Sequence, residues 1–232
     1  HARYAVHGGV NALAKRLARG IDVHLSHQVA HISLQGAGWL VVGDAGQRYH
    51  CRGLILTPPV PQSLALLERG GVPLHPGDHA ALARITYDPC LAGMFWCDPR
   101  PDLPEPGALQ RPDADIPWMA DNQRKGISPE AALVTVHASG ETSLRLWNTD
   151  EDQVLACLLS ALQPFLAPGA EIKEAHLKRW RYALPTVLHD ERMLVAAELP
   201  PLAFAGDGFG GPRVEGAALS GMAAAQVLGD AP

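Results

Sequence analysis

Apolar residues in the first part of the chain follow a helical spacing and then an alternating one. The segment 11–19 places apolar residues three and four positions apart and is followed by Gly20, which predicts an amphipathic helix. Apolar and polar residues alternate in 21–25, which predicts a strand with one buried face. The segments 29–34 and 39–42, separated by a glycine turn, predict two further strands.

A second pattern appears at 53–57, where Gly-Leu-Ile-Leu-Thr is apolar on both faces and Pro58 stops the run. Such a run is typical of a buried strand in a layered α/β sheet. The pattern returns near the C-terminus as a short apolar strand at 201–205, a glycine-rich turn at 206–211 and an Ala-rich helix at 214–228. The two ends of the chain therefore resemble parts of one domain.

The intervening segment 58–189 has a different character. Prolines concentrate between positions 98 and 117, which predicts a loop region. The expected elements around it are strands at 92–97, 132–138 and 142–147 and a helix at 151–166 that is capped by Thr149 or Asp150. We therefore expect a second domain at 58–189 with a mixed or antiparallel sheet and helices, inserted into a discontinuous first domain at 1–57 and 190–232.

The transition from strand to helix at 202–221 carries the strongest chemical signal. Asp207 stands where the strand ends, and the helix opens near Val214. The first N–H groups of a helix lack intrahelical partners and carry partial positive charge, which favours negative charge nearby. Gly216 and Gly221 each cost the helix about 1 kcal/mol relative to Ala. We expect other groups to pack tightly against both glycines.

The order strand, Gly-Asp, Val-Glu-Gly-Ala-Ala-Leu-Ser-Gly resembles the C-terminal flavin motif of the amine-oxidase superfamily. The resemblance implies that Asp207 holds the ribityl chain of FAD and that the backbone of Val214 meets the pyrimidine edge of the isoalloxazine. It extends the cofactor contacts to Arg213 and Glu215 beside Val214.

Two N-terminal segments are similar to the same superfamily. Gly8-Gly9 with the helix and strands after it is similar to the element whose backbone contacts adenine, which implies this role for Val29. Leu54-Ile-Leu-Thr-Pro-Pro-Val-Pro-Gln is similar to the strand that leads out of the FAD domain, which places Thr57 and Pro58 near the cofactor. Its Pro-Val-Pro-Gln ending resembles the renalase branch. The implied fold class is α/β, with an incomplete FAD/NAD(P)-binding-type domain and the inserted substrate domain.

Two further positions are candidate catalytic sites in the substrate domain. The resemblance to renalases places His137 near the flavin, and the alternative is a hydrogen-bonded histidine within a sheet. Trp180, Arg181 and Tyr182 combine aromatic faces with a fixed cation that suits a planar, charged ligand. The alternative for Trp180 is a core position where the two domains meet.

The superfamily's dinucleotide unit, strand–Gly-x-Gly-x-x-Gly–helix, has no counterpart at the start of the chain. The segment 206–211 matches this pattern literally, but no second strand and no ribose-binding carboxylate follow it, so we interpret it as an accidental match. We expect the chain to be the C-terminal two-thirds of an enzyme. A missing N-terminal segment or a companion chain would supply the dinucleotide unit, and the chain alone would bind FAD poorly.

Composition excludes several classes of partner. The net charge of −5 and the lack of a basic stripe argue against nucleic acid. No apolar run reaches the roughly 18 residues of a membrane-spanning helix. The four cysteines lack metal-binding spacing and predict reduced thiols in a cytoplasmic protein. His24, His27 and His31 do not form a metal site if 24 and 27 lie on opposite faces of a strand.

The resemblance implies an FAD-dependent oxidase of a small molecule. Its reaction would transfer hydride from a dihydronicotinamide- or amine-type substrate to flavin N5, with oxygen as acceptor and hydrogen peroxide as product. One alternative is a flavin amine oxidase or desaturase with another substrate. The other is a non-catalytic fragment that folds without cofactor.

Overall fold

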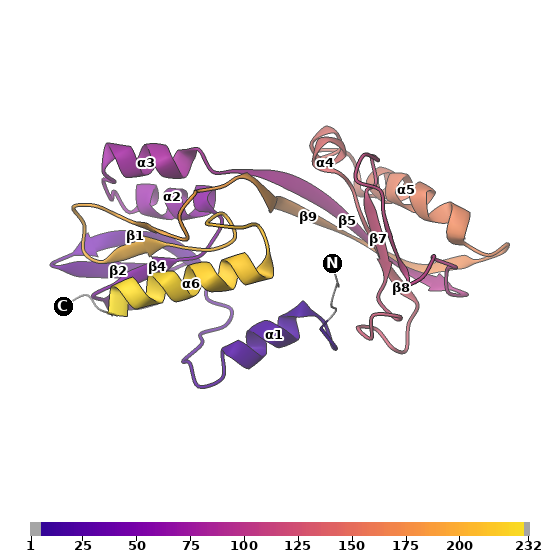
Figure 1. Cartoon of the computed structure of the whole chain (residues 1–232), viewed down its shortest axis with the longest axis horizontal. Coiled ribbons are helices and arrows are strands. Elements are labelled where there is room, and N and C mark those ends of the chain that lie inside the picture. Colours follow the sequence, from indigo (N-terminus) through magenta and orange to yellow (C-terminus); the bar gives the residue numbers. More distant parts are fainter. Residues whose placement is uncertain (1–5, 230–232) are drawn as a thin grey trace. The chain divides into compact units, whose positions relative to one another are not determined.

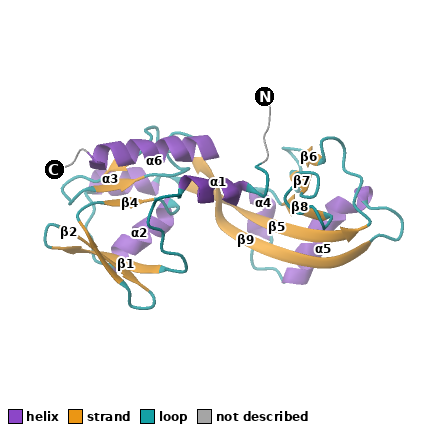
Figure 2. Ribbon diagram, turned by 90° about the horizontal axis from the view of Figure 1, so that it is seen from below, coloured by secondary structure: helices purple, strands orange, loops and turns teal. Residues whose placement is uncertain are grey.

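The computed structural model describes residues 6–229 and divides the chain into two compact units. Unit 1 comprises the described part of 1–23 together with 88–183, and unit 2 comprises 24–87 together with the described part of 184–232. Both units combine helices with sheets (Figures 1 and 2), which confirms the predicted α/β class. The assignment of 1–57 with 190–232 to an FAD domain and of 58–189 to a substrate domain stays a prediction.

Unit 2 contains two small sheets. One is antiparallel in the order β1-β2-β3, and the other has the order β10-β11-β4 with β11 parallel to β4. Their strands are β1 Val29–Gln35, β2 Gly38–Gly43, β3 Arg48–Cys51, β4 Leu54–Leu56, β10 Leu194–Val195 and β11 Leu202–Phe204. The helices are α2 Val60–Arg69, α3 Pro76–Ala83 and α6 Val214–Gly229.

The sheet that contains β4 and β11 lies between α2 on one side and α6 on the other (Figures 1 and 2), and both of its faces are apolar. On one face, Leu202 and Phe204 pack with α2 and with Trp39 of β2 in the main core. On the other face, Ala203 packs with Ala224 of α6. Because β11 is buried on both faces, its sequence is apolar at every position, as expected of a central strand.

Unit 1 is built on a five-stranded sheet in the order β6-β7-β8-β5-β9. Its strands are β5 Thr86–Asp98, β6 Ala108–Gln110, β7 Trp118–Asp121, β8 Leu133–His137 and β9 Glu171–Val187. Its helices are α1 Val10–Leu17, α4 Gly140–Arg145, α5 Glu151–Leu162 and the 3₁₀ turn Gln163–Phe165. The first two residues of β5 and the last four of β9 belong to unit 2.

One face of this sheet forms the core of unit 1. Phe95 of β5 and Val134 and Val136 of β8 pack against Val154 and Leu158 of α5. The helix begins where it was expected, because the Asp150 carboxylate accepts a hydrogen bond from the backbone N–H of Asp152. The opposite face of the sheet carries the alternate residues of the same strands and is partly exposed.

Two predicted strands are wrong. The segment 21–25 has no regular structure, and its apolar side chains Ile21, Val23 and Leu25 are 66%, 51% and 77% exposed. The segment 142–147 falls in and after α4, because the Ser139 hydroxyl accepts a hydrogen bond from the N–H of Thr142 and starts a helix. Alternation of apolar residues alone did not distinguish these segments from true strands.

The cysteines have the state predicted from the sequence, that of thiols without disulfide bonds. All four are free thiols. Burial raises the pKa of Cys90 and of Cys97 to about 11, so both stay protonated at neutral pH. Among the described residues, no helix combines the length and the apolar character needed to cross a bilayer.

Candidate functional site

The carboxyl ends of β4 and β11 lie side by side because the two strands run parallel. Thr57 follows β4, and Gly206 and Asp207 follow β11. Gly206 has a φ of 134°, and a Cβ there would lie 3.4 Å from the Thr57 carbonyl oxygen. The crevice outside the carboxyl ends of parallel strands is where ligands bind in open α/β sheets. The structure therefore brings Thr57 and Asp207 to one edge.

The loop 206–211 contacts Ser220 of α6 and the side chain of Tyr87. The buried Ser220 hydroxyl of α6 accepts a hydrogen bond of 2.9 Å from the N–H of Gly206. Gly208 faces Tyr87, because a Cβ at Gly208 would lie 2.8 Å from the Tyr87 hydroxyl oxygen. That hydroxyl also accepts a hydrogen bond of 3.3 Å from the N–H of Val60. The sequence analysis did not identify these roles: Tyr87 lies outside the motif at 202–221, and Ser220 lies inside it but in the interior of the helix.

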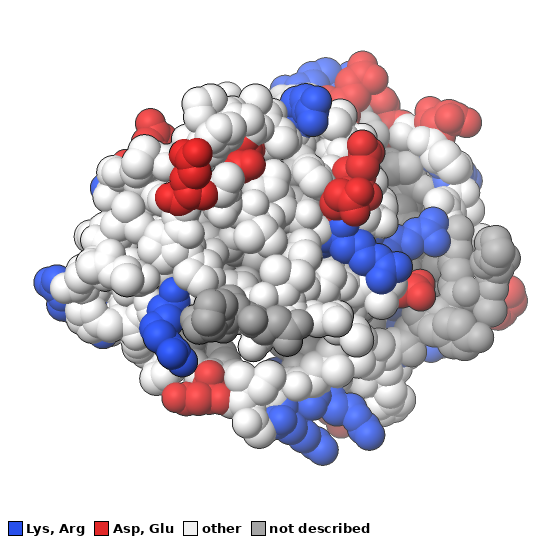
Figure 3. All heavy atoms as spheres, turned by 60° about the vertical axis from the view of Figure 1, so that its left-hand side comes forward, with Lys and Arg blue, Asp and Glu red and all other residues white. Residues whose placement is uncertain are grey.

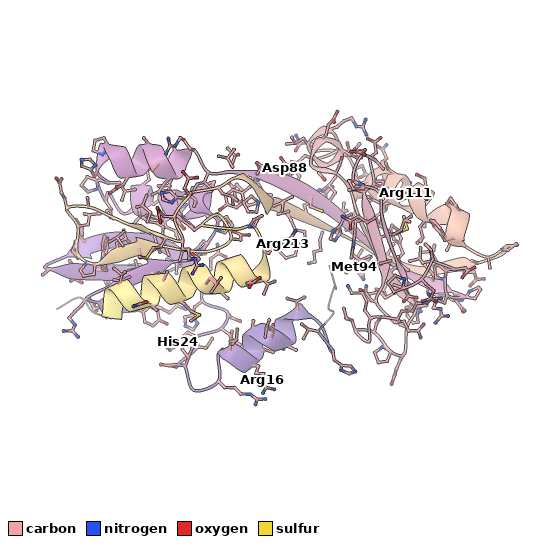
Figure 4. All side chains as sticks on the ribbon, viewed as in Figure 1. Arg16, His24, Asp88, Met94, Arg111 and Arg213 are labelled. Atoms are coloured by element: carbon pink, nitrogen blue, oxygen red, sulfur yellow. The ribbon has the colours of Figure 1, made fainter. Side chains whose placement is uncertain are left out.

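The start of α6 borders an open pocket of about 450 Å³. Its lining residues are Asp207, Pro212, Arg213, Val214 and Ala217. Figure 4 labels Arg213 directly before the helix. Val214 is 58% exposed, so the first turn of α6 is not buried against protein. A volume of this size falls within the roughly 300–1,000 Å³ of small-molecule sites.

The residues that line the pocket offer groups of the kind that the ring edge and the ribityl chain of a flavin require. The carboxylate of Asp207 offers acceptor oxygens for hydroxyl groups, and the first N–H groups of α6 favour a negatively charged ring edge. Gly211 and Gly216 keep loop and helix close, since a Cβ at Gly216 would lie 2.8 Å from the carbonyl carbon of Gly211. The expectation of tight packing is confirmed for Gly216. It is wrong for Gly221, where nothing described lies within 4 Å of an added Cβ.

The remaining predicted cofactor residues are less closely grouped. Pro58 follows Thr57, and its carbonyl accepts a hydrogen bond from the Ser63 hydroxyl of α2. Glu215 is exposed in the first turn of α6 but does not line the pocket. Val29 begins β1 in the other sheet of unit 2. Their cofactor contacts stay predictions.

Burial raises the pKa of the Asp207 carboxyl above its ordinary 3.8, although hydrogen bonds from its own N–H and from that of Gly208 oppose the shift. A raised pKa in the folded state means that the folded protein binds this proton more tightly than the unfolded chain does. The contribution of Asp207 to the free energy of unfolding therefore falls as the pH rises. The fall begins near the pKa of Asp207 in the unfolded chain and ends above its pKa in the folded protein.

We expect Asp207→Asn to remove this pH dependence. The free energy of unfolding of the variant, minus that of the wild type, should increase as pH rises from about 3 to about 7. Urea unfolding at a series of pH values measures both. A difference that decreases over this range would show that the folded pKa lies below the unfolded one.

His137 of unit 1 lies on the partly exposed face of the five-stranded sheet. It pairs with Trp118 of β7 and Ala92 of β5. The rings of Trp118 and His137 are in contact and tilted, with centroids 4.5 Å apart and an interplanar angle of 38°. The Lys125 ammonium lies 5.4 Å from the centroid of the Trp118 ring. Three side chains therefore form one cluster, the Trp118–His137–Lys125 cluster, of which the sequence indicated only His137.

The cluster shifts the pKa values of both its ionisable groups downward. Burial is the main cause of the lowered pKa of His137, and the positive charge of Lys125 adds to it. Burial also lowers the pKa of Lys125. The imidazole is therefore neutral at neutral pH, because its ordinary pKa of 6.5 is already lower than 7.

We expect Lys125→Met to raise the pKa of His137 without returning it to 6.5, because burial remains. An NMR titration of the imidazole measures this shift. The control is Lys178→Met on β9, which leaves the cluster unchanged. An unchanged His137 pKa in the Lys125 variant would mean that the ammonium does not act on the ring.

The aromatic-basic segment on β9 is more exposed than a core position. Trp180 is 59% exposed. The Arg181 guanidinium lies over the Trp147 ring at 5.0 Å from its centroid, so that cation is engaged within unit 1. Tyr182 is half-buried. Roles for these three residues stay predictions.

The reason given above against a metal site at the N-terminal histidines was wrong. His24 and His27 lie in irregular structure, and their rings are 5.4 Å apart rather than on opposite faces of a strand. Among the described residues, no group of His, Cys, Asp and Glu is arranged to bind a metal ion.

The face drawn in Figure 3 carries acidic and basic side chains interspersed on a mainly uncharged surface, without a basic stripe.

Comparison with known sequences assigns the family. The sequence model described as flavin containing amine oxidoreductase matches residues 2–229. The chain belongs to this family. The predicted amine-oxidase superfamily and FAD as its cofactor are thereby confirmed, whereas the renalase branch stays a prediction. The comparison with curated proteins gave no match.

Solved structures show the same fold. A putrescine oxidase bound to putrescine matches with a TM-score of 0.69 at 19% identity, over 96% of this chain and 53% of that one. A protein provisionally assigned as a protoporphyrinogen oxidase, from Exiguobacterium sp. 255-15, matches with a TM-score of 0.69 at 15% identity, over 96% and 51%. A protein from Pyrococcus furiosus matches with a TM-score of 0.61 at 18% identity, over 96% and 53%. The chain thus spans about half the length of the structures it matches.

Proposed function

We propose that this chain forms part of an FAD-dependent oxidase of the renalase type that acts on a small molecule in the cytoplasm. The observation that carries the proposal is the shared pocket of Asp207 and the first turn of α6 at the carboxyl ends of β4 and β11. FAD in this site supplies a hydride acceptor at N5, and its reoxidation by oxygen yields hydrogen peroxide. The substrate is a dihydronicotinamide- or amine-type molecule.

The chain's own residues bind and orient. Asp207 accepts hydrogen bonds from ribityl hydroxyls, and the N–H groups at Val214 stabilise negative charge at the pyrimidine edge. Thr57 and Pro58 border the same edge, and Arg213 and Glu215 stand on either side of Val214. The backbone of Val29 contacts the adenine.

In this proposal the segment 58–189 is the substrate domain, and 1–57 with 190–232 form the FAD domain. His137, Trp180, Arg181 and Tyr182 contact the substrate. A dihydropyridine donor is already rich in electrons and needs no dedicated general base, so positioning is the main task of these residues. The half-length match supports a further segment or companion chain that supplies the dinucleotide-binding unit.

Two alternatives have support of their own. The structural match to a putrescine oxidase favours an amine oxidase with another substrate. The half-length match is also consistent with a non-catalytic fragment that folds without cofactor. The proposed function and the two alternatives differ in whether the protein binds FAD and in which donor reduces the bound FAD.

The test uses the protein together with any segment that adjoins this chain in its gene. Flavin absorbance bands in the purified protein support the enzyme, and a colourless protein that takes up no added FAD rejects it. Anaerobic addition of dihydronicotinamide isomers or of simple amines then shows which donor bleaches the flavin. Bleaching by amines alone would reject the renalase assignment. Peroxide formation after oxygen is admitted tests the oxidase reaction.

A further inference from the structure

Tyr87 belongs to the apolar core on the α2 side of the β10-β11-β4 sheet. Its side chain packs against the buried cluster that includes Leu56 of β4 and Phe204 of β11. Burial raises the pKa of the Tyr87 phenol above its ordinary 10.0; the N–H of Val60 opposes this shift, and the charge of Asp207 adds to it. The phenol therefore keeps its proton at neutral pH.

The hydroxyl oxygen of Tyr87 caps α2 from a distant position in the sequence. The residue before the helix is Pro59, whose side chain accepts no hydrogen bond from the first turn. The N–H of Val60, one of the donors that a helix start leaves without an intrahelical partner, donates instead to the Tyr87 hydroxyl at 3.3 Å. Val60 is buried, so the loss of this acceptor would leave its N–H unsatisfied.

The same oxygen lies against the loop that carries Asp207. A Cβ at Gly208 would lie 2.8 Å from the Tyr87 hydroxyl oxygen, so glycine permits an approach that a larger residue would block. From the other side of the sheet, the Ser220 hydroxyl of α6 accepts a hydrogen bond from the N–H of Gly206. Asp207 thus stands between two neighbours that contact side chains on opposite sides of the sheet.

The backbone at His189 holds the far part of this loop. The N–H of His189 donates to the Gly208 carbonyl at 2.9 Å, and the N–H of Gly210 donates to the His189 carbonyl at 3.1 Å. These two bonds order the loop itself, but neither involves α2. Tyr87 connects the loop to the start of α2 and thereby to the turn after β4, where Thr57 lies.

We propose that Tyr87 is a positioning residue of the cofactor site, whose hydroxyl fixes the turn that carries Asp207 relative to the turn that carries Thr57. The inference rests on the proposed function and deepens it, because it states what holds the cofactor-binding carboxylate in place. Tyr87 acts through Asp207, as a supporting residue does for a group that binds a ligand directly. All three residues lie in unit 2.

The test is a double-mutant cycle on the dissociation constant for FAD, measured by calorimetry on the flavin-free protein with any adjoining segment. Tyr87→Phe removes one oxygen atom and keeps the ring in the core. We expect it to raise the dissociation constant roughly 3- to 10-fold, the effect of losing about one hydrogen bond. With Asp207→Ala already in place, Tyr87→Phe should change the constant less than about twofold, because no carboxylate remains to be misplaced.

A purely structural role for Tyr87 predicts a different pattern. If the hydroxyl only stabilised α2, Tyr87→Phe would lower the free energy of unfolding and either leave FAD affinity unchanged or weaken it equally in both backgrounds. Either result overturns the proposal. The matched control is Tyr49→Phe on β3, in the other sheet of unit 2, for which we expect wild-type FAD affinity.

A second variant, Gly208→Ala, changes the same contact from the loop side. The added methyl group collides with the Tyr87 hydroxyl, so the loop has to move away from α2. We expect FAD affinity to fall in this variant, and the fall to vanish when Asp207→Ala is also present. Wild-type affinity in Gly208→Ala overturns the proposal, including the case in which Tyr87→Phe does not fold.

Amide hydrogen exchange tests the structural step without any cofactor. In the flavin-free protein, the N–H of Val60 should exchange faster in Tyr87→Phe than in the wild type, and at the wild-type rate in Tyr49→Phe. An unchanged rate in Tyr87→Phe would show that the hydroxyl does not hold the start of α2, and it overturns the proposal.

The outcomes also separate this inference from the proposed function. A protein that takes up no FAD rejects the proposed function and, with it, the cofactor role of Tyr87. A protein that binds FAD equally well with tyrosine or phenylalanine at position 87 keeps the proposed function and loses the positioning role.

Discussion

Replacing Asp207 with alanine should raise the dissociation constant for FAD roughly 10- to 100-fold, which corresponds to the loss of hydrogen bonds to a charged acceptor. The carboxylate lies at the end of β11, lines the pocket beside α6 and accepts hydrogen bonds from the N–H groups of its own residue and of Gly208. A carboxylate has about four acceptor positions, so it can accept further hydrogen bonds from ligand hydroxyls. Titration of the flavin-free protein, prepared with any adjoining segment, measures the effect by absorbance or calorimetry.

The control for this experiment is Asp190→Ala. Asp190 is an exposed carboxylate of unit 2 that lines a different surface pocket, so its removal changes the net charge equally without touching the Asp207 site. We expect FAD affinity to stay within about twofold in the control. Equal losses in both variants would mean that general charge, rather than the Asp207 carboxylate, governs binding.

The part of the fold predicted from the sequence is the part fixed by local signals. The transition from β11 to α6 was predicted almost to the residue, because an apolar run, a glycine-rich turn and an Ala-rich helix follow one another within 30 positions. The strands β1 and β2 and the capped helix α5 were located for the same reason. Segment 21–25 shows the limit, since alternation creates a strand only where a neighbouring strand pairs with it.

The part of the site that the sequence missed depends on contacts between distant positions. The register of β7 and β8 pairs Trp118 with His137, and a loop brings Lys125 next to the Trp118 ring. The residues that flank Lys125 in the sequence form no motif that would predict this contact. Tyr87 reaches Gly208 across 121 positions. Such pairings are set by how strands align and pack, so single-chain periodicity does not reveal them.

Gly216 and Gly221 illustrate the same distinction within one helix. Both were expected to permit close packing, and both stand in α6 five residues apart. An added Cβ at Gly216 would lie 2.8 Å from the carbonyl carbon and 3.0 Å from the Cα of Gly211, and it would contact the Gly211 carbonyl oxygen more closely still. At Gly221 the same atom would enter open space.

Substituting alanine at the two positions should therefore change stability in opposite directions. Gly221→Ala should raise the free energy of unfolding by up to about 1 kcal/mol, because alanine favours the helix and meets no obstacle. Gly216→Ala gains the same propensity but forces backbone against backbone, and we expect a net loss of about 1–3 kcal/mol. Urea unfolding of the two variants and the wild type measures both changes.

The Gly216 variant also links stability to the cofactor. Gly211 ends the loop that begins with Gly206 and Asp207, so a shift of Gly211 away from α6 displaces the carboxylate and widens the pocket. Gly216→Ala should therefore weaken FAD binding, whereas Gly221→Ala should leave it unchanged. If Gly216→Ala destabilised the protein and still bound FAD with wild-type affinity, the loop–helix contact would support the fold alone, and the cofactor site would lie elsewhere.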